Sequence, residues 1–156
     1  MGEQMVTHKP GEGRSYWVLG GLYTVKVGAA DTGGAMTVIE FTVREGMGPP
    51  PHTHDCSETV YVLEGRMRFH LDGEVVEAGP GSFVHIPAGV WEQPEPVGTA
   101  KFLSVYQPGG FEEFFAEVGE PATSNTLPPV PEGPPDIARI AEVGARYGMQ
   151  VRSPEG

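Results

Sequence analysis

The sequence is poor in cysteine and in basic residues, and it has no long hydrophobic run. Cys56 is the single cysteine among 156 residues, which excludes an internal disulfide framework and favours a reducing compartment. Lysine and arginine number 10 against 21 acidic residues, and the net charge of −11 argues against nucleic acid or an anionic membrane as a partner. No apolar stretch approaches the ~20 residues of a membrane helix, and the N-terminus lacks the apolar run of a signal peptide. We therefore expect a cytoplasmic protein with no membrane partner.

Glycine and proline, in contrast, are abundant, at 23 and 16 residues, and up to Gly110 they separate short apolar runs. Within these runs, such as 37–43 and 66–72, apolar and polar residues alternate with the period of two that is typical of a strand with one buried face. No helical period occurs in this part of the chain. Many short strands separated by turns predict an all-β sandwich or barrel over residues 16–110, after an N-terminal arm of residues 1–15.

The pattern changes in the C-terminal segment, residues 111–156. Four apolar residues there have the helical spacing i, i+3, i+4 and i+7: Phe111, Phe114, Phe115 and Val118. They predict a short helix whose apolar stripe covers one end of the barrel. A connector with six prolines follows between residues 120 and 135, and a second helix is predicted from Ile137 to near Gly148.

The residues that point to chemistry lie between Gly46 and Gly65. His52 and His54 are two residues apart, so their side chains point the same way on an extended strand. Glu58 has the same parity and joins that face if the strand continues. Two imidazoles and a carboxylate on one face predict a first-row transition-metal site, because imidazole suits Fe, Ni, Cu or Zn.

This segment resembles the first motif of the cupin family, in which glycine, two histidines, glutamate and glycine recur at fixed spacings. The matching residues are Gly46, His52, His54, Glu58 and Gly65. A second cupin-like motif follows at Gly81, Pro87 and Gly89. The resemblance implies a small cupin with a double-stranded β-helix, or jelly-roll barrel. It also implies one bound divalent transition-metal ion (Fe, Mn, Ni, Co or Zn), a small-molecule substrate and a homodimer.

Glu92 stands where cupins usually have a third histidine ligand, and three interpretations are open. In the first, Glu92 joins His52, His54 and Glu58 as a metal ligand, which favours Fe(II) or Mn(II) over Cu. In the second, the two histidines and one carboxylate form a facial triad with open positions, and the other glutamate is a general base. In the third, the metal is lost and the pocket only binds; the two glutamates then crowd each other and the pKa of one is raised. We take all four residues as the expected ligands.

The chain beyond the barrel resembles quercetinase-like monocupins, from the run 108–115 through the proline connector to the last helix. That resemblance implies a metal-dependent dioxygenase acting on a small aromatic or enolic, quercetin-like substrate. Glu58 would then be the catalytic base that takes the proton of the substrate hydroxyl. Two other classes of function are open: a cupin isomerase or polyketide-type cyclase that needs no oxygen, and a non-catalytic small-molecule-binding cupin.

Overall fold

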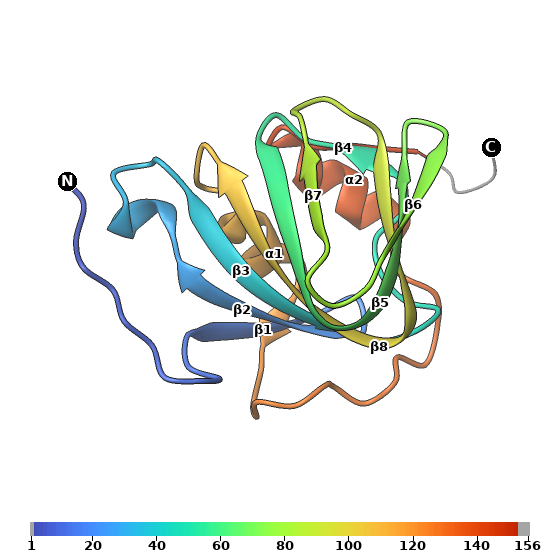
Figure 1. Ribbon diagram of the computed structural model, residues 1–156, viewed down its shortest axis with the longest axis horizontal. Coiled ribbons are helices and arrows are strands. Elements are labelled where there is room, and N and C mark those ends of the chain that lie inside the picture. Colours follow the sequence, from blue (N-terminus) through green and yellow to red (C-terminus); the bar gives the residue numbers. More distant parts are fainter. Residues whose placement is uncertain (1, 153–156) are drawn as a thin grey trace.

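The computed structural model describes residues 2–152, which form ten strands, two α-helices and one short 3₁₀ helix (Figure 1). The strands are β1 (Arg14–Val18), β2 (Gly21–Val27), β3 (Thr37–Val43), β4 (His52–Thr53), β5 (Ser57–Leu71), β6 (Glu74–Ala78), β7 (Phe83–Ile86), β8 (Glu92–Gln107), β9 (Glu120–Pro121) and β10 (Gln150–Val151). The helices are η1 (Ala29–Asp31), α1 (Glu112–Val118) and α2 (Ile137–Ala145). The helices α1 and α2 follow the long strands, as the sequence predicts for an all-β fold with a helical extension.

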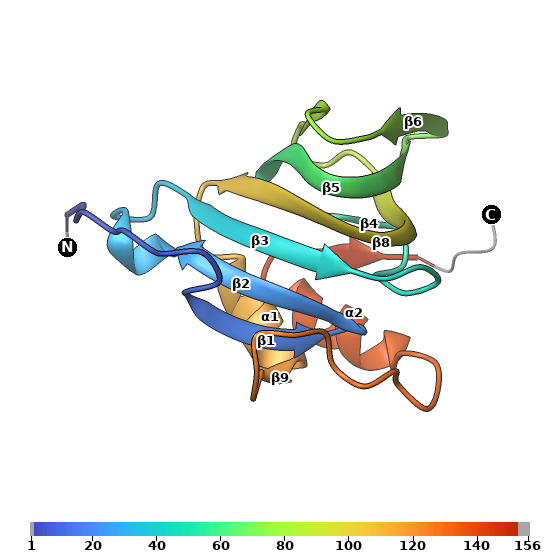
Figure 2. The ribbon, with the colours of Figure 1, turned by 60° about the horizontal axis from the view of Figure 1, so that its bottom comes forward.

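Two long strands, β5 and β8, form the centre of the barrel. They pair antiparallel over most of their lengths, and β6 and β7 share the other edge of β5. The other edge of β8 pairs with β4 and β3, and the sheet continues from β3 through β2 and β1 to β9. In Figure 2 these strands descend from β6 at the top to β1 at the bottom, with α1 and α2 packed at the lower end.

The alternation of apolar residues decides which side chains fill the barrel. On β3, Ile39 and Phe41 are buried, while the residues between them are only partly covered. Phe41 stacks on Phe102 of β8 with ring centroids 4.8 Å apart. On β5, Met67 and Phe69 are fully buried. Each such side chain contributes about 1.5–3 kcal/mol, so a one-residue slip of register would expose several of them at once.

The helix α1 closes one end of the barrel with aromatic side chains. Phe111, Phe114 and Phe115 are buried, which confirms the predicted apolar stripe. Glu112 is buried as well, because its carboxylate accepts hydrogen bonds from the backbone N–H of Ala29 at 2.8 Å, the N–H of Gly110 at 3.0 Å and a Thr37 hydroxyl. These three donors offset the cost of burying the carboxylate and fasten the start of α1 to β3 and η1.

Segments near both limits of the described residues contact the body of the fold. In the segment expected as an arm, Glu3 forms an isolated bridge with Thr32, and β1 begins at Arg14. After β9 the connector crosses below β1 to α2 (Figure 2), and β10 then pairs with β4. Within residues 2–152 we find no helix with the length and apolarity needed to cross a membrane.

Candidate metal centre

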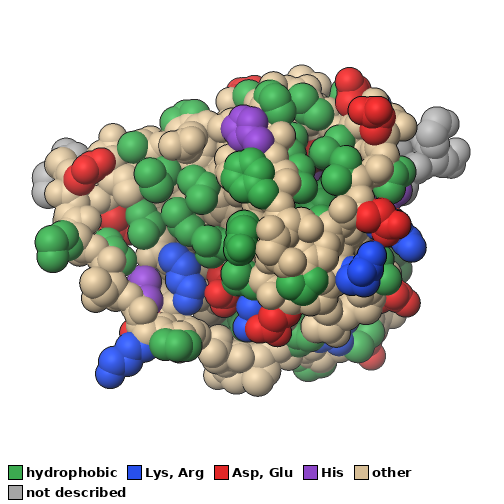
Figure 3. All heavy atoms as spheres, in the orientation of Figure 1, with side chains coloured by type: hydrophobic (Ala, Val, Ile, Leu, Met, Phe, Trp, Pro, Cys, Tyr) green, Lys and Arg blue, Asp and Glu red, His purple; other side chains and the backbone are tan. Residues whose placement is uncertain are grey.

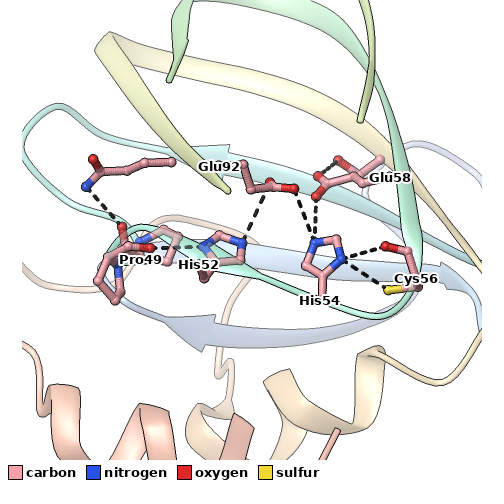
Figure 4. A network of polar contacts seen from close by, with 9 residues as sticks. Pro49, His52, His54, Cys56, Glu58 and Glu92 are labelled. Atoms are coloured by element: carbon pink, nitrogen blue, oxygen red, sulfur yellow. Dashed lines mark hydrogen bonds and ion pairs between the residues drawn. The ribbon is translucent and has the colours of Figure 1, made fainter. Parts of the chain in front are cut away.

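Neighbouring strands bring His52 and Glu92 together inside the barrel. His52 of β4 is the register partner of Glu92, the first residue of β8, and His52 Nε2 lies 3.6 Å from Glu92 Oε1. His54 follows two residues later, and its Nε2 lies 3.4 Å from Glu92 Oε2. All three side chains are buried. In Figure 4 both imidazole rings point their Nε2 atoms at the Glu92 carboxylate.

Backbone carbonyl groups fix the orientation of both imidazoles. His52 Nδ1 lies 2.9 Å from the carbonyl oxygen of Pro50, and His54 Nδ1 lies 2.7 Å from that of Cys56. A carbonyl only accepts hydrogen bonds, so each Nδ1 is the N–H donor, and each Nε2 is the atom that offers a lone pair when its ring is neutral. Metal-binding histidines are held in this way. The stiff Pro49-Pro50-Pro51 run supplies one of the two carbonyls.

Glu58 lies beside His54 rather than among the three converging residues. Candidate ligand atoms of His52, His54 and Glu92 all lie within 4.8 Å of one another. Glu58 Oε1 lies 3.3 Å from His54 Nε2, and Ser104 donates a 2.7 Å hydrogen bond to Glu58 Oε2. The condition under which Glu58 would share the face of the two histidines, a strand that continues from His54 to Glu58, is not met. The chain bends there, and Glu58 enters the site from β5.

The pKa values of the two histidines shift in opposite directions, and so do those of the two glutamates. Burial lowers the pKa of His52 to about 4. Burial also lowers the pKa of His54, but its hydrogen bond with Cys56 and the charge of Glu58 outweigh this and raise it to about 11. Burial raises the pKa of Glu58, whereas the hydrogen bond and charge of His54 bring it below its ordinary value. Burial and then the charge of Glu58 raise the pKa of Glu92 well above normal. Near neutral pH, the metal-free site therefore holds a His54–Glu58 ion pair beside neutral His52 and Glu92.

The donor set fits a divalent transition-metal ion. Two Nε2 atoms are pre-oriented, and Glu92 Oε2 is buried without a hydrogen-bond partner among the described residues. A buried polar atom normally has such a partner, so this oxygen is suited to an ion. The positive charge would also offset the repulsion between Glu58 and Glu92 that raises one carboxyl pKa.

The free space beside these ligands is small and mostly apolar. The cavity measures about 50 Å³ and is lined by aromatic rings that include Phe102, Tyr106 and Phe111. The rings of His54 and Phe111 lie 5.0 Å apart. Burial and then the charge of Glu58 raise the pKa of Tyr106, so its hydroxyl keeps its proton.

Three further residues bear on the composition of the site: Cys56, His85 and Ser104. Cys56 is buried, with its sulfur 3.4 Å from His54 Nδ1. His85 is exposed on β7 and hydrogen-bonds Thr59 at 2.9 Å, so it does not reach the cavity as a further imidazole ligand. Sequence reasoning missed Ser104, although a small polar residue at a buried position of a strand is a detectable signal.

Comparison with known proteins identifies the family. Residues 39–106 match the family model described as "Cupin domain". The chain belongs to the cupin family. This cupin is also similar to a quercetin 2,3-dioxygenase of Bacillus subtilis (strain 168), with 31% identity over 113 residues, or 71% of this chain and 34% of the relative. It thus spans about a third of the length of that relative.

Two solved structures are similar to this chain in fold. The cupin resembles the polyketide cyclase RemF from Streptomyces resistomycificus, with 27% identity and a TM-score of 0.59 over 67% of this chain and 80% of that one. It also resembles an RmlC-like cupin from Shewanella frigidimarina, with a TM-score of 0.63 over 72% of this chain and 99% of that one. The second match, at 14% identity, concerns the fold alone. The predicted all-β cupin barrel is confirmed.

Proposed function

We propose that this cupin is a metal-dependent dioxygenase that acts on a small aromatic or enolic, quercetin-like substrate. The observation that carries the proposal is the convergence of His52, His54 and Glu92, with candidate ligand atoms within 4.8 Å of one another. Two histidines and one carboxylate are the donor set of facial-triad oxygenases, which leaves coordination positions open for dioxygen and substrate. The similarity to a quercetin 2,3-dioxygenase supports the same class of reaction.

In this proposal His52, His54 and Glu92 hold one divalent ion, and the carboxylate favours Fe(II) or Mn(II) over Cu. When bound, the ion supplies Lewis acidity and a common shell for substrate and oxygen. Glu58, also expected as a ligand from the sequence, serves as the base, because Ser104 holds its Oε2 and leaves Oε1 directed into the site.

The protein groups around the ion prepare the proton transfer. In the metal-free protein the hydrogen bond and charge of His54 outweigh burial and hold the pKa of Glu58 below its ordinary value. A bound ion would supply positive charge in place of the His54 proton, so the carboxylate stays ionised near neutral pH and is able to accept the proton of a substrate hydroxyl. Tyr106 keeps its proton and offers a hydrogen bond to the substrate oxygen. The phenylalanine rings around the cavity exclude bulk water from the resulting anion.

Oxygen uptake with quercetin tests the proposal, after the protein has been loaded separately with Fe, Mn, Co, Ni and Zn. The variant Glu58→Gln is expected to lower kcat by about 10²–10⁴ while retaining metal, because it removes only the base. Glu64→Gln is the matched control, since Glu64 is an exposed residue of the same strand. The absence of oxygen consumption by every metal-loaded form with quercetin and simpler enols would refute the dioxygenase assignment.

A polyketide-type cyclase is the second candidate, and the similarity to RemF favours it. The same ion would polarise a carbonyl group, and Glu58 would move a proton without any use of oxygen. Turnover that persists under nitrogen would support this activity over the dioxygenase. A non-catalytic binding role would be supported if metal-free protein bound small aromatic molecules as tightly as the metal-loaded protein and neither form converted them.

A further inference from the structure

The cavity beside the candidate ligands is too small for the proposed substrate. Its volume of about 50 Å³ accommodates an ion with one or two waters. Pockets for small organic molecules are usually about 300–1,000 Å³. A ring system of flavonol size therefore needs further space, with only its reacting end beside the ion.

A groove of about 980 Å³ lies directly beside this cavity. One wall is the proline connector, residues 128–136, and the other wall is formed by residues 17–20 and 46–48. Four residues line both the groove and the metal cavity: Leu19, Met47, Gly48 and Ile140. Because they are shared, the groove opens towards the candidate metal site.

Hydrogen bonds between the two walls hold the groove in shape. The guanidinium of Arg44 donates to the carbonyl oxygen of Gly20 at 3.1 Å and to that of Pro128 at 2.5 Å, so it bridges the walls. The indole N–H of Trp17 donates to the carbonyl oxygen of Thr126 at 2.9 Å. The connector prolines further restrict this wall. These contacts indicate a preformed groove rather than a gap under a loose loop.

Met47 stands at the junction between groove and cavity. Its side chain packs against Gly20, where an added Cβ would lie 2.3 Å from the Met47 sulfur. Its neighbour at the junction, Leu19, has φ of 49°, a left-handed conformation that is unusual for a leucine. Met47 has three rotatable side-chain bonds, so it is able to swing aside without movement of the backbone.

We propose that the groove binds the non-reacting body of the substrate, and that Met47 gates the passage of the reacting end to the metal cavity. The lining consists mainly of Trp17, prolines and aliphatic side chains, which suit planar apolar rings. Three acidic residues, Glu120, Glu132 and Asp136, outnumber the one basic lining residue, Arg139, and with a net charge of −11 they disfavour anionic ligands. The expected occupant is a neutral, elongated, planar aromatic molecule. This inference rests on the proposed function for the identity of the reacting end.

Calorimetric titration of quercetin into metal-loaded protein under nitrogen tests the groove without relying on turnover. Met47→Trp is expected to raise the Kd at least about tenfold and to leave metal content unchanged, because the indole blocks the junction. Met5→Trp is the control, since Met5 is 95% exposed. Val130→Glu, a change in the connector wall, is expected to raise the Kd about fivefold by placing a charge against the ligand. Its control is Val75→Glu on exposed β6.

The outcomes separate the groove from the dioxygenase assignment. Binding that both groove variants weaken, without any oxygen uptake by the wild type, would support the groove and contradict the dioxygenase. Oxygen uptake and Kd values that stay within twofold of wild type in both variants would overturn the groove while leaving the dioxygenase intact. A wild-type protein that binds neither quercetin nor smaller neutral phenols would also overturn it.

Discussion

Glu92→Gln is expected to weaken metal binding without destabilising the metal-free protein. Without metal, burial and the charge of Glu58 raise the pKa of Glu92 well above normal, so the carboxyl group is protonated near neutral pH. Its Oε2 has no hydrogen-bond partner within residues 2–152. A neutral amide of the same shape should therefore change the free energy of unfolding by no more than about 1 kcal/mol. With metal, the same substitution removes a charged ligand.

The size of the effect follows from the linkage between binding and folding. Substitution of a residue that only supports a metal ligand lowers metal affinity by about 10–100-fold, so loss of a ligand itself should lower metal affinity by at least about 100-fold. An ion present at about 100 times its Kd stabilises the wild type by about 2.7 kcal/mol. For a chain of this size, that corresponds to an increase in Tm of about 5–10 °C. At the same ion concentration the variant would gain only about 0.4 kcal/mol, or about 1 °C.

Thermal unfolding with and without each ion, combined with elemental analysis, measures both effects. Glu95→Gln is the matched control, because Glu95 lies on the same strand, is half exposed and forms an ion pair with His70 away from the metal ligands. An E92Q protein with wild-type metal content and the full increase in Tm would show that Glu92 is not a ligand. A strongly destabilised metal-free variant would instead indicate a structural role for the carboxyl group.

Three further predictions concern pH, stability and assembly. Apparent metal affinity should rise about tenfold per pH unit for each proton displaced, because His54, with a pKa of about 11, must lose its proton to bind the ion. Metal titrations between about pH 6 and 8 measure this slope. A metal affinity that does not change with pH would contradict the prediction. Glu112→Gln should lower the free energy of unfolding, measured by urea denaturation, by about 2–3 kcal/mol, since an amide cannot accept all three buried hydrogen bonds. The control Glu113→Gln, at an exposed residue, should change it by less than about 0.5 kcal/mol. We propose that the apolar side chains gathered over β5 and β7 (Figure 3), with Tyr61 opposite Phe83, form the contact of the expected homodimer. Phe83→Glu should then give the mass of a monomer in light scattering. A monomeric wild type would rule this contact out.

The parts of the fold that depend on local pattern could be predicted from the sequence. The alternation in residues 37–43 gives the bounds and the buried face of β3, because burial of one face fixes the parity of a strand. The His-x-His spacing likewise places His52 and His54 on one side of the site. In both cases neighbouring residues in the sequence determine the outcome.

Features that depend on distant segments could not be predicted in this way. Glu112 has the sequence context of an exposed helix residue, and it is buried only because Thr37 and Ala29 come from elements about 80 residues away. The groove needs the connector to lie against the turn after β1, and its walls are about 110 residues apart in sequence. No periodicity within either segment predicts the contact between the connector and this turn.

Glu92, in the position where cupins usually have a histidine, would reduce the net charge of the metal centre in this apolar site. Two carboxylates and a divalent ion give a centre with no net charge, whereas one carboxylate would leave a positive charge among phenylalanine rings. Burial of a net charge is costly, so the neutral centre is easier to place in this cavity. In the metal-free protein a proton on Glu92 performs the same neutralisation beside the His54–Glu58 pair. The ion and the proton are thus alternative occupants of one carboxylate, and metal uptake at neutral pH should release protons to the buffer.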